Sequence, residues 1–276
     1  MLMTPMNFHC CGVLRPAFSF PWATTVFMSI FAISFPLLSQ DKVFKNSQAT
    51  ASLIELYSSE GCSSCPPAEA WINQLKSAPG LWKDIFPVAF HIDYWDGLGW
   101  PDRFARADYT ARQKNYANQL GQDSVYTPEF IVNGLEWRRN WLGGQELPAT
   151  RAQKSGELSL TVRGSDHQLS AVYLPGPSAP TGPLELQVAL LGFNLVTDVQ
   201  RGENGGRKLE HDFVVLGFGS APLTTGADRS FQCDSLEVKS STDDPPGAVV
   251  AWVSGSDGSI CQVTGGWLSP ADLLKR

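Results

Sequence analysis

Two cysteines separated by two residues, Cys62 and Cys65, are the side chains of this sequence that are best suited to chemistry. A pair with this spacing can close a small disulfide ring, and thiol–disulfide exchange begins when a thiolate attacks a disulfide sulfur. A sulfur at the start of a helix has its thiolate stabilised by unpaired N–H groups and by the helix dipole. Cys62, the more N-terminal of the two, is therefore the candidate nucleophile, and Cys65 is the candidate resolving cysteine.

The residues on either side of the pair indicate a strand before it and a helix after it. Residues 51–58 read ASLIELYS and are strand-like. Pro66 and Pro67 suit only the first turn of a helix, where an N–H group would have no partner anyway. Beyond them, apolar residues recur with the spacing of one helical face, at Ala68, Trp71, Ile72 and Leu75. The cysteines are thus predicted at a strand-to-helix junction.

A cysteine pair of this kind also has roles other than catalysis. A zinc site needs two more ligands, usually as a second pair. The remaining candidates show no paired spacing, and they are His91, His167, His211, Cys233 and Cys261. The sequence therefore predicts no metal centre. Two alternatives to catalysis stay open for the pair, which are a structural disulfide in a non-catalytic binding module and metal delivery through the thiols.

The first half of the chain continues with elements that alternate between strand and helix. Residues 87–94 form an apolar run typical of a central strand, and residues 104–120 are helical in composition. Residues 129–132 are strand-like and lead into Asn133-Gly134, which is a strong hairpin signal. A short helix is expected over residues 147–154.

The pattern changes at about residue 155. Short runs of alternating apolar and polar residues follow one another, separated by turns rich in glycine, proline, asparagine and aspartate. Such runs are typical of an antiparallel β-sandwich. Nothing in this half assigns Arg207, His211 or Asp212 to a site.

Several runs of the sequence resemble a family of uncharacterised bacterial secreted proteins with a thioredoxin-like domain. They are LIELYSSEGCSSCPPAEAWINQL, AFHIDYWDGLGW, TARQ with the YA and LG after it, VYTPEFIVNG and GENGGRKLEHDFVV, over roughly residues 51–267. With the order of elements, the resemblance implies an α/β thioredoxin-like domain over residues 50–154, followed by an antiparallel β-sandwich-like domain over residues 155–268. In that superfamily a cis-proline faces the CxxC pair, and the residue before it contacts the substrate backbone. Thr127 and Pro128 match that position, which implies a cis bond and a substrate-binding role for both.

Other residues near the pair have two interpretations each. In thioredoxin-like folds a buried carboxylate under the CxxC pair can accept the proton of the resolving thiol, and Asp93 is the candidate for this role; its alternative is a loop-capping carboxylate. His91 is either a proton-transfer residue or a hydrogen-bonded core histidine. Glu60 either raises a thiolate pKa by repulsion or is a solvated turn residue. Four aromatic residues either line an apolar groove or pack in the interior, and they are Tyr94, Trp95, Trp100 and Phe104.

The N-terminus indicates export. An apolar run from Val26 to Leu38 follows Arg15, and no residue between Pro16 and Gln40 is charged. A short apolar core after a positive flank is typical of a secretory signal, although the run would also just span a bilayer. We therefore expect residues 1–39 to be either a cleaved signal peptide or a retained N-terminal membrane anchor. The remainder is expected in the bacterial periplasm or outside the cell, either free or anchored to the inner membrane.

Export allows disulfides to form in the rest of the chain. Two of the six cysteines precede the apolar run, and the four that follow it permit three pairings. The economical choice joins Cys62 to Cys65 and joins Cys233 to Cys261. The second of these is expected to be a structural disulfide between two strand-like segments.

The composition excludes several classes of function. Of 276 residues 17% are charged, the net charge is −6, and no lysine or arginine run is present, so nucleic-acid binding has no support. A mean hydropathy of −0.12 excludes a multi-span membrane protein. No phosphate-binding loop, zinc-protease helix or nucleophile elbow occurs. The sequence therefore predicts a thiol–disulfide oxidoreductase of the cell envelope that needs no cofactor. It would act on a protein or small thiol or disulfide substrate, together with an unknown redox partner.

Overall fold

The structure is a computed structural model, and it describes residues 41–47, 51–138, 156–163, 168–177, 179–226, 228–269 and 272. The predicted signal or anchor over residues 1–39 and the predicted short helix over residues 147–154 lie outside these residues. In the described part of the chain, no helix is both long enough and apolar enough to cross a membrane.

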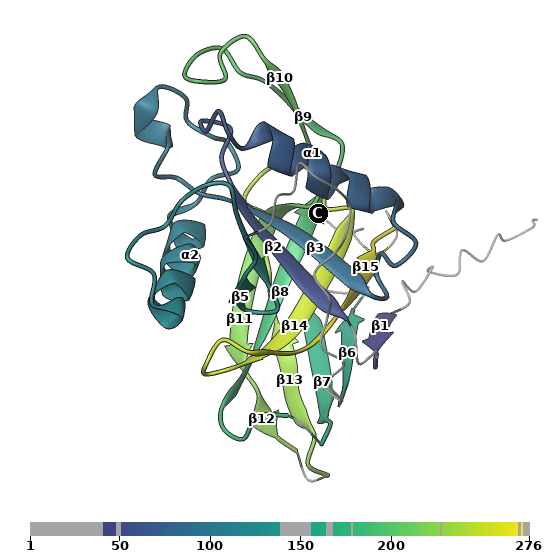
Figure 1. Ribbon diagram of the computed structural model, residues 1–276. Helices are drawn as coiled ribbons and strands as arrows, with labels where there is room; N and C mark the ends of the chain where they lie inside the picture. Colours follow the sequence, from purple (N-terminus) through teal and green to yellow (C-terminus); the bar gives the residue numbers. More distant parts are fainter. Residues whose placement is uncertain are drawn as a thin grey trace, which may run out of the picture. The chain divides into compact units, whose positions relative to one another are not determined.

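The larger of the two main sheets has eight strands that come from both halves of the chain. They are β2 (Ser52–Ser58), β3 (Ile85–His91), β4 (Glu129–Val132), β5 (Leu135–Glu136), β8 (Leu184–Gly192), β11 (Val214–Pro222), β14 (Ala248–Gly255) and β15 (Ile260–Trp267). Their order across the sheet is β15-β14-β8-β11-β3-β2-β4-β5 (Figure 1). β3 pairs in parallel with β2 on one side and with β11 on the other, whereas the other pairings are antiparallel.

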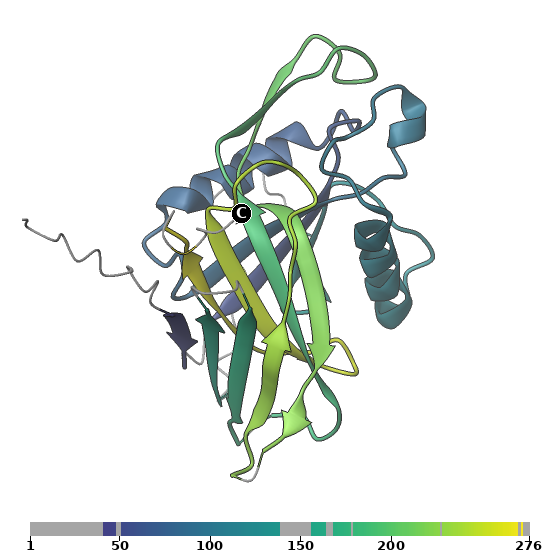
Figure 2. The same ribbon diagram turned by 180° about the vertical axis from the view of Figure 1, so that it is seen from behind.

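A second sheet packs against one face of the first (Figure 2). Its strands are β1 (Lys42–Asn46), β6 (Gly156–Val162), β7 (Leu169–Pro175), β12 (Thr224–Thr225) and β13 (Phe231–Leu236), in the order β1-β6-β7-β13-β12. Successive side chains of a strand point to opposite faces, and β14 uses both. Val249 and Ala251 belong to the core shared with β6 and β7, whereas Val250 and Trp252 belong to the core on the opposite face.

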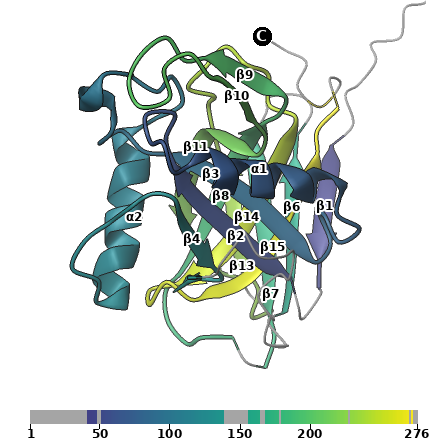
Figure 3. The same cartoon turned by 45° about the horizontal axis from the view of Figure 1, so that its top comes forward.

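Two helices and a hairpin surround the start of the CxxC segment. Helix α1 (Pro66–Gln74) continues into a 3-10 turn at Leu75–Ser77, a second such turn covers Asp96–Leu98, and helix α2 covers Ala107–Leu120. Strands β9 (Leu195–Asp198) and β10 (Lys208–His211) form a separate two-stranded hairpin. Figure 3 shows α1 lying across β2 and β3, with this hairpin beside it. Helix α2 ends at Gly121, whose φ of 68° is left-handed and suits glycine.

The expected fold class is wrong. We expected an α/β thioredoxin-like domain followed by an antiparallel β-sandwich-like domain, but the described chain is mostly β-sheet, and β2 to β5 share one sheet with β8, β11, β14 and β15. The two sets of strands meet where the Ala89 N–H donates a 2.8 Å hydrogen bond to the Phe213 carbonyl. A free edge on β3 would expose unpaired backbone groups, and β11 covers that edge. The result is two packed sheets of the β-sandwich type, and the described residues form one compact unit.

Candidate active site

The turn that follows β2 holds the two cysteines at the start of α1. The Cys62 N–H donates to the Ser59 carbonyl at 3.2 Å, and the Cys65 N–H donates to the Cys62 carbonyl at 3.2 Å. Cys65 is the N-cap residue of α1, and prolines occupy the first two helical positions. The predicted strand-to-helix junction is therefore found, with both sulfurs near the N-terminal end of the helix.

Cys62 has the surroundings of an activated thiol. Its sulfur lies 3.2 Å from the Ser64 hydroxyl, and in the protonated form its thiol donates a long, 3.8 Å hydrogen bond to the Thr127 carbonyl. The pKa of Cys62 is lowered to about 6, first by a hydrogen bond with Cys65 and further by Ser64 and Thr127, which together outweigh burial. Because the pKa lies below 7, the thiolate is the main form at neutral pH. Only 1% of the Cys62 surface is exposed.

Cys65 has the opposite character. It is fully buried, and burial together with the hydrogen bond to Cys62 raises its pKa well above the ordinary value. One cysteine of the pair is therefore held as a thiolate while the other keeps its proton. The roles predicted from the sequence, Cys62 as nucleophile and Cys65 as resolving thiol, require such an asymmetry and stay predictions.

The Thr127 carbonyl lies beside Cys62, in the position that the resemblance implied. The peptide bond between Thr127 and Pro128 is cis, which confirms the expected conformation. The Thr127 carbonyl accepts hydrogen bonds from Cys62 and from the Ser64 hydroxyl, at 3.8 and 3.4 Å. The Thr127 hydroxyl accepts a 2.8 Å hydrogen bond from the Trp95 indole. Trp95 thus fixes the loop that carries Thr127 and Pro128, called the proline loop below.

The β9–β10 hairpin contacts the turn that carries Cys62 and Cys65, called the cysteine turn below. Sequence reasoning missed this contact. The Asn204 amide, which is fully buried, donates 2.9 Å hydrogen bonds to the carbonyls of Glu60 and Cys62. The Ser63 N–H donates to the Glu203 carboxylate at 3.0 Å. The run GENGGRKLEHDFVV contains both residues, but no sequence spacing links it to the cysteines. The only signal for this contact was the resemblance, which included that run.

A cluster of buried acidic and histidine side chains lies behind the turn. His91 Nδ1 lies 2.7 Å from Asp102, and His211 Nδ1 makes a short hydrogen bond with Glu69. His211 Nε2 lies 3.4 Å from a Glu60 oxygen, and the two imidazole rings meet edge to face with centroids 5.3 Å apart. All five side chains are buried. The cluster joins β3, α1 and β10 beneath the cysteine turn.

Charge pairing dominates the electrostatics of this cluster. Burial lowers the pKa of His211, but the carboxylates of Glu69 and Glu60 outweigh burial and raise it to about 10. Burial raises the pKa of Glu69, but His211, with smaller contributions from His91 and Ser58, lowers it to about 2. Glu69, His91 and His211 each offer one ligand atom, all within 4.8 Å of one another, so these three could hold a metal ion.

The remaining expectations near the pair have mixed outcomes. Asp93 accepts a 2.6 Å hydrogen bond from the Thr110 hydroxyl of α2, and no hydrogen bond joins it to either cysteine among the described residues. The buried carboxylate close to the resolving thiol is instead Glu69, which accepts a hydrogen bond from Ser58 behind Cys65.

Glu60 is fully buried and accepts a 2.7 Å hydrogen bond from the Trp100 indole, so its interpretation as a solvated residue is wrong. Of the four aromatic residues, Phe104 is buried and Tyr94 is 37% exposed.

Cys233 and Cys261 lie on strands of different sheets, β13 and β15, and both belong to the core between the sheets. Each is a free thiol in this structure, as are Cys62 and Cys65. Burial raises the pKa of both Cys233 and Cys261, so neither is an activated thiol. The disulfide that we expected between them stays a prediction for the oxidised protein.

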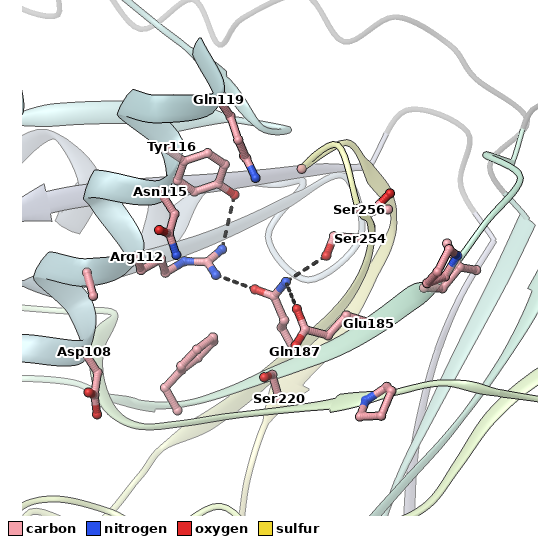
Figure 4. Close-up of a pocket in the computed structure, with 17 residues that line it drawn as sticks. Asp108, Arg112, Asn115, Tyr116, Gln119, Glu185, Gln187, Ser220, Ser254 and Ser256 are labelled. Carbon is pink, nitrogen blue, oxygen red and sulfur yellow. Dashed lines mark hydrogen bonds between the residues drawn. The ribbon is translucent and has the colours of Figure 1, made fainter. Parts of the chain in front are cut away.

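A cavity of about 560 Å³ lies between α2 and strands β8, β11 and β14, and the cysteines do not line it (Figure 4). Arg112 enters it from α2, donates to Glu55 at 2.9 Å and to Tyr116 at 3.2 Å, and also bonds Gln187. The guanidinium lies 5.2 to 5.3 Å from four aromatic ring centres, those of Phe90, Tyr116, Phe218 and Trp252. These contacts fix α2 to the sheet. They also give the Arg112 charge its partners within the protein, so its presence in the cavity does not by itself indicate a ligand.

Comparison with known proteins supports a family and a fold. A protein-family profile described as "Protein of unknown function (DUF1223)" matches residues 53–254. No curated protein matches the sequence. Two solved structures are similar. One is a crystal structure of an Agrobacterium tumefaciens protein, with 20% identity, a TM-score of 0.50, and coverage of 79% of this chain and 93% of the other. The second is HBP35 of Porphyromonas gingivalis, with 17% identity, a TM-score of 0.53, and coverage of 81% and 76%. At these identities the likeness concerns the fold alone.

Proposed function

Since the chain belongs to the DUF1223 family, which has no known function, we propose from the geometry of the site that the protein is a thiol–disulfide oxidoreductase acting through Cys62 and Cys65. The observation that carries the proposal is the asymmetry of the pair. The pKa of Cys62 is lowered to about 6, whereas that of Cys65 is raised well above its ordinary value. A structural disulfide needs no such difference, because neither sulfur has to act first.

The proposed reaction is reduction of a disulfide substrate R–S–S–R′. The Cys62 thiolate attacks one sulfur, forms a mixed disulfide with R and releases R′ as a thiolate. Cys65 then passes its proton to the released R′ thiolate, and the Cys65 thiolate attacks the Cys62 sulfur, which releases R as a second thiolate. The pair is oxidised to the Cys62–Cys65 disulfide by two electrons, and the substrate gains those electrons. A dithiol donor has to reduce the pair again, and in the opposite direction the same steps oxidise a dithiol substrate.

The neighbouring loops support this chemistry and set a condition on it. The Thr127 carbonyl already faces the Cys62 sulfur, so an extended substrate backbone could take its place beside the proline loop. Because Cys62 is only 1% exposed, a substrate can reach it only after the hairpin or the proline loop moves. We therefore expect slow exchange with bulky disulfides unless the substrate itself opens the site.

The reduction potential of the pair tests the proposal. The full chain would be equilibrated in glutathione buffers of graded ratio, after which free thiols are trapped and located by mass spectrometry. We expect a potential above about −270 mV, near the thioredoxin level, and modification of Cys62 before Cys65 at mildly acidic pH. Cys62→Ser should abolish exchange with a small disulfide, while Cys65→Ser should trap the mixed disulfide. Cys233→Ser serves as the control for a buried thiol outside the site.

A second candidate function is favoured by the burial of Cys62, namely a binding module whose pair is a permanent disulfide. A potential below about −300 mV, where the glutathione pool cannot reduce the bond, would support that candidate and contradict catalysis. The same trapped samples distinguish the two functions.

We also propose that the protein works outside the cytoplasm, because residues 1–39 have the pattern of a signal or anchor. Such a compartment allows the pair to be oxidised. Fractionation of cells that express the full chain tests this. Recovery in the cytoplasmic fraction would contradict the proposal.

A further inference from the structure

Three buried polar atoms behind the cysteine turn make no hydrogen bond, and they are Nε2 of His91, Nε2 of His211 and one carboxylate oxygen of Glu60, Oε1. The last two face each other as an ion pair at 3.4 Å, so Nε2 of His91 is the atom of the three that has no partner. The two imidazoles are each only 1% exposed. A buried polar atom without a partner is rare in native proteins and is a sign of a missing ion or water. Its position in the cluster indicates an occupant that the imidazoles and carboxylates share.

The hydrogen bonds around the two histidines favour a metal ion as that occupant. His91 has its Nδ1 beside Asp102 at 2.7 Å, and His211 has its Nδ1 beside Glu69. In metal sites a ligating histidine almost always donates its other ring N–H to a carboxylate or carbonyl, which fixes the tautomer and directs the free nitrogen at the metal. His91 has this arrangement, and its left-over nitrogen is Nε2. In His211 it is Nε2 that faces a carboxylate, Glu60, at 3.4 Å, so Nδ1 is the nitrogen that can share an ion with Glu69.

Charge and donor type point to the same ligand. Three carboxylates are buried here, those of Glu60, Glu69 and Asp102, and no lysine or arginine bonds them within the described residues. A doubly charged cation would offset this negative charge and would take the place of the His211 proton. Two imidazoles and one carboxylate form a donor set that suits zinc and other divalent transition metals.

We propose that Glu69, His91 and His211 bind one divalent transition-metal ion, with Zn²⁺ as the first candidate. Their ligand atoms already lie within 4.8 Å of one another. Tetrahedral zinc with bonds of about 2.1 Å places its ligands about 3.4 Å apart, so small side-chain shifts complete the site. The Glu69 oxygens bond Ser58 and His211, and each keeps a second lone pair for a metal. No cysteine takes part.

The ion would connect three elements that are distant in sequence. Glu69 lies on α1, His91 on β3 and His211 on β10, so the ion fastens the β9–β10 hairpin to the sheet and helix behind the cysteine turn. We expect zinc to raise the melting temperature of the protein and to protect the hairpin against proteolysis.

Metal binding by the full chain tests the site. Protein stripped with a chelator would be given Zn²⁺, desalted and assayed by elemental analysis, with one equivalent expected. His91→Ala and His211→Ala should each lose the metal. Glu210→Gln should keep it, because Glu210 is the exposed neighbour of His211 on the same strand. The double variant Cys62→Ser/Cys65→Ser should also keep it, which separates this site from the cysteine pair and from the proposed redox function.

Cobalt binding by the wild-type chain gives an answer even if the histidine variants do not fold. Co²⁺ in the site should show the visible bands of a tetrahedral ion without the ultraviolet charge-transfer band that thiolate ligands produce. A strong thiolate band, or loss of the metal in the cysteine variant, would assign the ion to the CxxC pair and overturn the proposal. Failure of the wild-type chain to retain either metal would overturn it as well, and would leave water and ion pairs as the partners of the cluster.

Discussion

The Asn204 side chain donates a 2.9 Å hydrogen bond to the backbone carbonyl of Cys62, which lies 142 positions earlier in the chain. The same amide bonds the Glu60 carbonyl, so one buried side chain holds both ends of the turn that leads to the nucleophile. Arg207 in turn bonds the Asn204 oxygen at 2.8 Å and orients the amide. The hairpin therefore fixes the backbone of the turn that carries Cys62.

Asn204→Ala should make Cys62 more reactive toward small alkylating reagents. Losing hydrogen bonds worth about 1–2 kcal/mol raises the population of open conformations by roughly 5–30 fold. The measurement is the rate of alkylation of Cys62, followed by mass spectrometry. Asn115→Ala, an exposed asparagine on α2, is the matched control. An unchanged rate would mean that the hairpin does not limit access.

Cys65→Ala should raise the pKa of Cys62. The main cause of its low pKa, about 6, is the hydrogen bond from Cys65, so removal of that thiol shifts the pKa upward toward the ~8.5 of a free cysteine. In the wild-type protein the thiolate forms as pH rises through about 6; in the variant it forms at higher pH. Ultraviolet absorbance of the thiolate during a pH titration measures this without a reagent having to reach the sulfur. A midpoint that stays near 6 would assign the shift to Ser64 and the turn.

Arg112→Met should destabilise the protein by about 3–5 kcal/mol, since it leaves the buried Glu55 carboxylate unpaired. The Arg112 side chain is 13% exposed and that of Glu55 is fully buried. Urea unfolding measures the change in the free energy of unfolding. Lys45→Met removes an exposed ion pair with Glu157, and this control should cost no more than ~1 kcal/mol. Equal losses in both variants would argue against a special role for the buried pair.

A chain limited to residues 41–154 should not fold cooperatively. In the full protein β11 covers the edge of β3, and Trp252 and Val250 of β14 belong to the core that surrounds β2 and β3. The shortened chain lacks all of these contacts. Thermal unfolding followed by circular dichroism should show a sharp transition for the full chain and none for the fragment. A cooperative transition in the fragment would instead support an independent first domain.

The site was predictable where its signals are local. The spacing of Cys62 and Cys65, the two prolines after them and the apolar helical face all act within about a dozen residues. For this reason the strand-to-helix junction at the cysteine pair followed from the sequence. The cis bond before Pro128 followed from a resemblance that placed it opposite the pair.

The buried cluster was not predictable, because its members come from distant segments. The resemblance makes Asp93 the candidate proton acceptor, yet its carboxylate bonds Thr110, whereas Glu69 lies in the interior. His211 had no sequence relation to the cysteines. Strand pairing brings it to Glu69, and no periodicity records which strands will pair.

The sequence by itself determined the local elements around the cysteine pair and the membership of a family, because periodicity, proline positions and residue type act at short range. Only the tertiary structure decided that β3 and β11 join both halves of the chain into one sheet. It also decided that Asn204 holds Cys62, and that Glu69, His91 and His211 meet in the interior. These contacts depend on which distant surfaces exclude water together, and that is settled by packing of the whole chain.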